Sequence, residues 1–267
     1  MTASLRAPGW TRERVSFTWS KEISSPQRLS TRDGTGKPWH HLQSMVATLW
    51  SSARALIFDF DGVLADSEPF WRESYNRALA PHGISIPPDE YWEHWSSKGE
   101  GLRGHLRRHG ITGIDPDAIE RAQQRIYAGF VERGEIALVG DAAHLLEVLL
   151  RPGARPLVIA SNTARPLVEA LLAQGHAPRP RIVGGEGLKP KPAPDIVVAA
   201  ADVLGVPPRE ALVIEDTEKG IRAARAAGAK VLLVRTPYNR HLHLEADEEV
   251  PGIGTLVTWA EEEATSG

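Results

Sequence analysis

The sequence contains no cysteine among its 267 residues. Without thiols the chain can form neither disulfides nor thiolate metal sites, and it has no cysteine nucleophile. The absence fits a reducing compartment, so we expect a cytoplasmic protein. Long apolar runs are also lacking, because Arg, Pro or Gly interrupts them before they reach the length of a membrane span. We therefore expect no association with a membrane.

An excess of charge of one sign is absent as well. The 31 basic and 34 acidic residues give a net charge of −3, which leaves no basic surface of the kind that binds polyanions. We therefore expect no nucleic-acid partner. The length suffices for one large domain, or for a core domain with a smaller insert. The oligomeric state cannot be read from the sequence.

Regular periodicity is missing from the first fifty residues. Residues 1–52 are rich in Ser, Thr, Arg and Pro, and they show neither a helical nor a strand pattern. No continuous apolar segment suggests a secretory signal, and the acidic residues in this stretch fit a transit peptide poorly. We interpret residues 1–52 as an N-terminal extension, either a disordered tail or a segment upstream of a true start at Met45.

From Arg54 onward, short apolar runs alternate with helical patterns. Five runs have the length and composition of buried strands: residues 55–58, 156–160, 181–183, 211–214 and 230–234. Four helical patterns lie between them, at residues 141–150, 165–174, 194–204 and 219–227. This alternation predicts an α/β fold, with a parallel sheet covered by helices on both faces. Ligands of such sheets bind at the carboxyl ends of the strands.

Residues 67–137 interrupt the alternation. They carry amphipathic helical patterns, for example at residues 70–80 and 118–130, and no convincing strand. We expect this insert to form a small α-helical cap that closes over a substrate and excludes water. The predicted organisation is a catalytic core of residues 53–66 and 138–267, with the cap between its two parts.

Polar side chains gather just past the predicted strands, or just before a core helix. They are Asp59, Asp61, Ser161, Asn162, Lys191, Glu215 and Asp216. Taken singly, each has an ordinary structural explanation, such as a helix cap, a turn or a solvated charge. Because the carboxyl ends of parallel strands meet at one edge of a sheet, we expect these side chains to converge. That convergence favours a functional site.

This set of residue types suits phosphoryl transfer. Crowded carboxylates repel one another unless a hard cation lies between them, and oxygen ligands favour Mg²⁺. Asp59 could then attack phosphorus and form an aspartyl-phosphate, while Asp61 acts as general acid and later as general base. Lys191 and Ser161, with Asn162 beside them, would bind the phosphate oxygens of the substrate.

Four segments in order resemble the motifs of the haloacid-dehalogenase-like hydrolase superfamily. They are Phe58 to Leu64, Ile159 to Asn162, Lys191 to Asp195, and Val213 to Thr217 followed by Gly220. The resemblance covers about residues 54 to 236. It implies a Rossmann-like core, with a helical cap inserted between the first and second motifs.

The resemblance also implies roles for particular residues. Mg²⁺ would be held by Asp59, by the backbone carbonyl of Asp61, and by Asp216 with Glu215 assisting. Dehalogenases lack the second aspartate, here Asp61, so halide chemistry is not expected. The likeness is greatest to phosphatases and to the beta-phosphoglucomutase-like group. We therefore predict a Mg²⁺-dependent phosphatase of a small phosphorylated metabolite, with sugar phosphates favoured.

Two alternatives stay open. Sugar-phosphate mutases resemble this chain but place a cap histidine where this sequence has Trp71, which favours simple hydrolysis here. Their substrate-binding loop partly resembles residues 98–103, so Lys98 or Arg103 would either contact a second phosphate or belong to a solvated face. A non-catalytic binding protein on the same fold is disfavoured, because unused clustered carboxylates destabilise a fold by mutual repulsion.

Overall fold

The first helix departs from the prediction for the N-terminal extension. In a computed structural model that describes residues 39–266, α1 spans Trp39–Ser52. Contacts divide the chain into two units, Met1–Leu42 and Gln43–Gly267, and the strands that the structure describes all belong to the second. The predicted disorder of residues 1–38 lies outside the described residues. α1 is anchored because Trp50 is buried, and the Arg155 guanidinium donates to its carbonyl oxygen and lies 4.8 Å from its ring.

The core of the second unit is a six-stranded parallel sheet, which confirms the predicted α/β fold class. Its strands lie in the order β3-β2-β1-β4-β5-β6, and each neighbouring pair is parallel. Their bounds are β1 Ala55–Phe58, β2 Leu157–Ala160, β3 Arg181–Val183, β4 Ala211–Glu215, β5 Lys230–Val234 and β6 Glu248–Val250. The sixth strand was not predicted, because it has three residues and two of them are charged.

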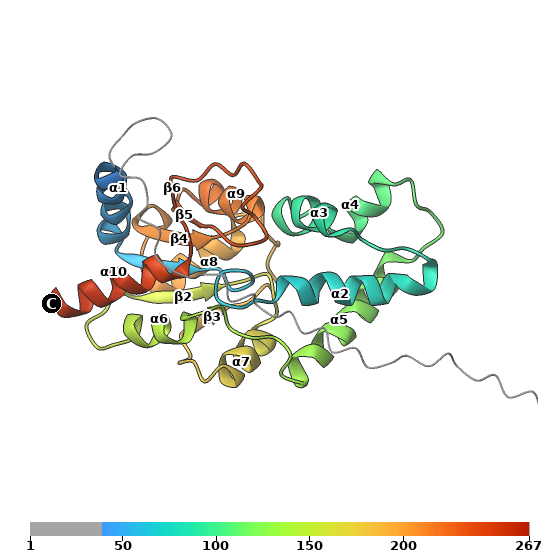
Figure 1. The fold of residues 1–267 in the computed structure, drawn as a ribbon, viewed down its shortest axis with the longest axis horizontal. Helices are drawn as coiled ribbons and strands as arrows, with labels where there is room; N and C mark the ends of the chain where they lie inside the picture. The colour runs from blue at the N-terminus through green and yellow to red at the C-terminus, as the bar shows by residue number, and fades with distance from the viewer. Residues whose placement is uncertain (1–38, 267) are drawn as a thin grey trace, which may run out of the picture. The chain divides into compact units, whose positions relative to one another are not determined.

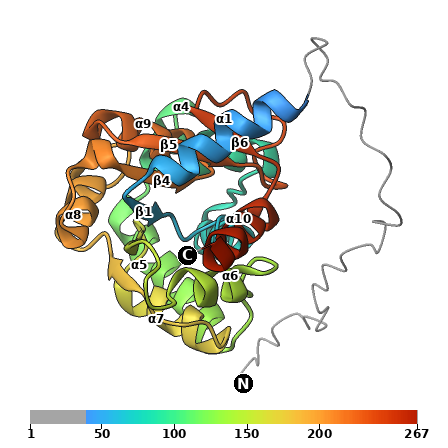
Figure 2. The ribbon, with the colours of Figure 1, turned by 90° about the vertical axis from the view of Figure 1, so that its left-hand side faces the viewer.

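Two helical layers cover the two faces of this sheet (Figures 1 and 2). Successive strand side chains point to opposite faces, so Leu56 and Phe58 pack into one layer and Ala55 and Ile57 into the other. The first layer comprises α1, α6 Ala142–Leu149, α7 Arg165–Gln174 and α10 Ile253–Ser266. The second comprises α8 Asp195–Leu204 and α9 Glu218–Ala227. A short 3₁₀ turn, Pro208–Glu210, precedes β4.

A group of helices between β1 and α6, here called the cap, has an apolar core of its own. Its elements are α2 Glu68–Leu79, the 3₁₀ turn Ala80–His82, α3 Pro88–Glu90, the π-helical segment η2 Tyr91–Ser97, α4 Gly101–Arg108 and α5 Pro116–Glu132. Leu79, Ile86 and Leu102 are among the side chains buried in its centre. The cap adjoins one end of the core in Figure 1. Among the described residues, no helix is both long and apolar enough to cross a membrane.

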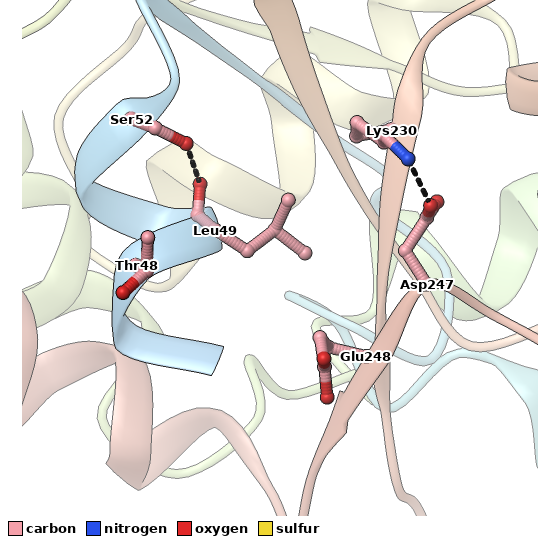
Figure 3. Close-up of a pocket in the computed structure, with 6 residues that line it drawn as sticks. All are labelled: Thr48, Leu49, Ser52, Lys230, Asp247 and Glu248. Atoms are coloured by element: carbon pink, nitrogen blue, oxygen red, sulfur yellow. Dashed lines mark hydrogen bonds and ion pairs between the residues drawn. The ribbon is translucent and has the colours of Figure 1, made fainter. Parts of the chain in front are cut away.

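The core also has a hollow of about 320 Å³ at the amino ends of β5 and β6 (Figure 3). Three residues of α1 line it, together with Lys230, Asp247 and Glu248. Lys230 is already paired with Asp247 at 2.6 Å, so its charge is neutralised within the wall. The hollow therefore lies at the opposite edge of the sheet from the predicted functional residues.

Candidate active site

The predicted residues converge at the carboxyl edge of the sheet. Asp59, Ser161 and Asp216 directly follow β1, β2 and β4. A cavity of about 20 Å³ is lined by Asp59, Asp61, Glu68, Ser161, Asn162, Lys191, Thr217 and Lys219. The two remaining predicted residues, Glu215 and Asp216, are buried beside Asp59, with carboxylate oxygens of all three within 4.8 Å of one another. All seven predicted residues therefore belong to one site.

Lys191 links two of the buried carboxylates. Its Nζ donates to Asp59 Oδ1 and to Glu215 Oε1, each at 2.8 Å. Burial alone would lower the pKa of Lys191, but the two adjacent carboxylates hold it above its usual value. The backbone N–H of Lys191 donates to Asn162 Oδ1 at 3.0 Å. Asn162 therefore anchors the loop that carries the ammonium, in addition to lining the cavity.

Glu215 is fixed as a carboxylate by its surroundings. Burial tends to raise its pKa, but Lys191 and the hydrogen bonds from Thr217 lower it below the usual value. Its Oε2 accepts from the backbone N–H groups of Asp216 and Thr217, at 2.7 and 2.9 Å, and from the Thr217 hydroxyl at 2.9 Å. A Cβ on Gly220 would lie 1.7 Å from Glu215 Oε1, so this position requires glycine.

Asp59, Glu215 and Asp216 fit a divalent cation. Asp216 Oδ1 is buried and has no hydrogen-bond partner among the residues described, which is costly for a carboxylate oxygen unless a cation compensates it. The turn at Gly62 (φ +83°) approaches closely, because a Cβ there would lie 2.2 Å from Asp216 Oδ2. The three side chains offer oxygen donors alone, which is the ligand set that Mg²⁺ prefers.

Mg²⁺ affinity is expected to increase with pH. Burial, reinforced by Glu215, raises the pKa of Asp59 to about 7, and burial also raises the pKa of Asp216 well above its usual value. A cation binds the deprotonated carboxylates, so protons must leave first. Calorimetric titration at pH 6, 7 and 8 should show affinity rising with pH, by up to about tenfold per unit for each carboxyl that must lose a proton. Asp216→Asn should weaken binding throughout, and an affinity independent of pH would contradict this assignment.

The Asp61 side chain accepts four hydrogen bonds. Oδ1 accepts from Ser67 Oγ at 2.6 Å and from Trp71 Nε1 at 3.0 Å. Oδ2 accepts from Ser161 Oγ at 2.8 Å and from Thr163 Oγ1 at 2.7 Å. The Ser161 hydroxyl, predicted to bind phosphate, is thus directed at Asp61 in this structure. With both side-chain oxygens engaged, the backbone carbonyl is the group of Asp61 suited to a cation.

Several residues of the site were not predicted. Ser67 and Thr163 lie within three residues of recognised motif positions, so their hydroxyls could have been proposed as partners of Asp61. Trp71 was considered solely as a replacement for histidine, yet its ring stacks on Tyr127 with centroids 3.9 Å apart while its N–H reaches Asp61. Lys219 gave no sequence signal, because a single lysine on a helix is ordinarily solvated.

The matching family model decides the classification. It is described as haloacid dehalogenase-like hydrolase, and it matches residues 53–228. The chain belongs to this family. The resemblance seen in the motifs is confirmed, and the order of the strands places the motif residues at one edge as that resemblance implies.

Individual members of the haloacid dehalogenase-like family are also similar to the chain. Protein CbbY of Rhodobacter capsulatus is 31% identical over 224 residues, which cover 78% of this chain and 96% of the relative. Fructose-1-phosphate phosphatase YqaB of Escherichia coli is 29% identical, with coverage of 67% and 95%. A mutant CbbY of Rhodobacter sphaeroides, solved with xylulose-(1,5)bisphosphate, superposes with a TM-score of 0.64 at 29% identity, covering 78% and 96%. The predicted enzyme class, a phosphatase of this family, is confirmed.

Proposed function

We propose that this haloacid dehalogenase-like phosphatase hydrolyses a phosphorylated sugar in a Mg²⁺-dependent reaction, through an aspartyl-phosphate on Asp59. The observation that carries the proposal is the placement of Asp59. It lines a cavity with Asp61, and its carboxylate lies within 4.8 Å of those of Glu215 and Asp216. A nucleophile, a proton donor and a cation-binding cluster therefore share one small space.

Asp59 is oriented for attack by Lys191. The ammonium binds Oδ1, whereas Oδ2 has no hydrogen bond to any residue the structure describes, so Oδ2 is the attacking atom. The new bond joins Oδ2 to phosphorus as the bond from phosphorus to the sugar oxygen breaks. Mg²⁺ held by Asp59, Asp216, Glu215 and the Asp61 carbonyl would offset the negative charge of the phosphate and the carboxylates.

Asp61 serves both halves of the reaction. Its protonated carboxyl gives the proton to the departing sugar oxygen, and the resulting carboxylate then takes a proton from water. That water attacks phosphorus, the bond to Asp59 breaks, and inorganic phosphate leaves. Three of the four donors to Asp61 are hydroxyls, which can rotate to accept a hydrogen bond. Trp71 can only donate, so it favours the carboxylate that activates water.

Replacing Trp71 by phenylalanine should slow phosphate release by about 10- to 100-fold, the loss typical of one hydrogen bond to a charged group. Trp71→Phe keeps an aromatic ring to stack on Tyr127 but removes the donor to Asp61. The decrease should appear in kcat rather than KM, because the interaction is with the proton-transfer group. Trp92→Phe is the matched control, because Trp92 belongs to the same cap but packs on the rings of Tyr91 and Tyr238. An unchanged kcat for Trp71→Phe would contradict a role of the Trp71 N–H in proton transfer by Asp61.

A sugar phosphate is supported by the relatives. YqaB is named for fructose 1-phosphate, and the CbbY mutant was solved with a sugar bisphosphate. A mutase is the weaker candidate, since the cap residue that contacts Asp61 is Trp71 rather than the histidine that the mutases carry.

Phosphate release from a panel of phosphorylated sugars and short phosphorylated acids tests the proposed function. We expect Mg²⁺-dependent release that EDTA abolishes and that excess Mg²⁺ restores. Interconversion of sugar phosphate isomers without release would instead indicate a mutase. If the folded protein had neither activity, the remaining interpretation would be a non-catalytic binding protein on the same fold.

A further inference from the structure

Lys219 is a cation in the wall of the catalytic cavity, and its positive charge acts to lower the pKa values of the buried carboxyls of Glu68 and Asp216, which burial raises. It lies near the start of α9, three residues after Asp216, and its side chain is half-buried. No hydrogen bond joins its ammonium to any described residue, and no described carboxylate lies within 4.0 Å of it. Lys191, the other lysine that lines the cavity, already donates to two carboxylates. Lys219 is therefore the cavity lysine that retains its capacity to bind an anion.

The cap holds the stem of Lys219 in place. Ser97 Oγ, at the end of η2, accepts from the backbone N–H of Glu218 at 3.2 Å, which docks the cap segment on the start of α9. A Cβ on Gly99 (φ +74°) would lie 3.2 Å from Lys219 Cδ and 3.3 Å from its Cβ. The cap backbone thus lies directly against the methylene groups of Lys219. The ammonium is partly desolvated and has no direct hydrogen bond to a carboxylate of the described residues, so a bound anionic group would offset part of its desolvation cost.

The cap cations suggested by the sequence are already engaged. Lys98 pairs with Glu93 at 2.7 Å, and both side chains are partly open to solvent. Arg103 pairs with Asp117 at 2.5 Å and approaches Glu120 at 3.8 Å, with about half of its side chain exposed. Neither lines the cavity. Both fit the solvated helix face that was the alternative interpretation of these residues.

The position of Lys219 indicates which part of a substrate it meets. The reacting phosphate must lie against Asp59, where Lys191, Ser161 and Asn162 also line the cavity. The rest of the substrate extends toward the cap, because the cap forms the opposite wall. Lys219 lies under Gly99 of the cap. The methylene stem of Lys219 therefore lies on the side of the cavity toward which the non-reacting portion of the molecule extends.

We propose that Lys219 binds a second anionic group, a phosphate or a carboxylate, on the part of the substrate that is not hydrolysed. This assignment rests on the proposed function, since it uses Asp59 to place the reacting phosphate. We therefore expect substrates with two anionic groups to bind more tightly than their counterparts with one. A lysine suits this task, since its ammonium is a compact point charge on a flexible stem.

Two matched pairs of ligands test the proposal. One is fructose 1,6-bisphosphate against fructose 1-phosphate, and the other is 2-phosphoglycolate against 2-hydroxyethyl phosphate. Binding is measured by calorimetry with Mg²⁺ in an Asp59→Asn background, so that the result does not depend on turnover. Lys219→Met is compared with Arg222→Met, an exposed residue of the same helix.

Lys219→Met should reduce the preference for the doubly charged member of a pair by about 10-fold or more, and Lys219→Arg should retain most of it. A change confined to the sugar pair identifies a second phosphate, and one confined to the short pair identifies a carboxylate. Equal weakening of both members of each pair would place Lys219 on the reacting phosphate and overturn the proposal, as would no change. Failure of the proposed function would appear separately, as absent phosphate release by the wild type.

Discussion

Asp59→Asn should reduce phosphate release by about 10⁴-fold or more, because an amide oxygen cannot replace the carboxylate as a nucleophile toward phosphorus. The fold should survive this change. The new amide oxygen can still accept from Lys191, and Lys191 keeps its second bond to Glu215. Removing a carboxylate whose pKa is raised by burial to about 7 also removes a buried charge. Release is measured under saturating Mg²⁺, and folding is checked by thermal unfolding.

The matched control for Asp59→Asn is Asp202→Asn. Asp202 is exposed on α8 and does not line the cavity, so its replacement should leave release unchanged. If Asp59→Asn kept more than about a tenth of the activity, water activated by Asp61 would have to attack phosphorus directly. The covalent intermediate would then be wrong, although the chain would remain a phosphatase.

Lys191→Met should destabilise the metal-free protein by about 3–5 kcal/mol at neutral pH, the usual cost of leaving buried charges unpaired. Methionine has a similar length but no charge, so Asp59 and Glu215 would face each other without the ammonium between them. Both carboxylates are almost completely buried. The free energy of unfolding is measured by urea denaturation in the presence of EDTA.

The pH dependence of that difference has a definite sign. Lys191 lowers the pKa of Glu215 in the folded protein, so this stabilisation is present above the unfolded pKa of about 4.5 and is lost as pH falls through the folded value. The gap between wild type and Lys191→Met should therefore narrow in acid. Lys189→Met, at an exposed neighbouring position, should change stability by no more than about 0.5 kcal/mol. A loss below about 1 kcal/mol in Lys191→Met would mean that water reaches these carboxylates.

The sequence predicted the strands that carry the site because each is a short, fully buried apolar run. β1 and β4 are buried along their whole length, and their starts match the predicted positions. The terminal elements were missed for different reasons. β6 is short and charged, whereas α10 buries Ile253, Leu256 and Ala260 on one face, a helical spacing that the sequence does contain. α1 depends on tertiary contacts of Trp50 with Arg155 and Trp259, which no local pattern reveals.

The convergence of the candidate site residues could be predicted from the sequence, but their hydrogen-bond partners could not. Asp59, Ser161 and Asp216 each directly follow a strand. The sequence therefore places them at the same edge of the sheet, because the carboxyl ends of parallel strands lie together. Which donor meets which oxygen depends on side-chain packing across segments far apart in the sequence. Ser161 and Asp61 are 100 residues apart, and Trp71 reaches Asp61 from the cap. The methylene groups of Lys219 lie against Gly99, which belongs to the cap and is distant from Lys219 in the sequence.

A cavity of about 20 Å³ between cap and core has room for about one water molecule, far less than the several hundred Å³ of a typical ligand pocket. We therefore expect a phosphorylated sugar to enter, and phosphate to leave, when the cap moves away from the core. The bonds from Trp71 to Asp61 and from Glu218 to Ser97 would break and form again in each catalytic cycle. If the cap moves in this way, the frequency of its opening would set an upper limit on turnover.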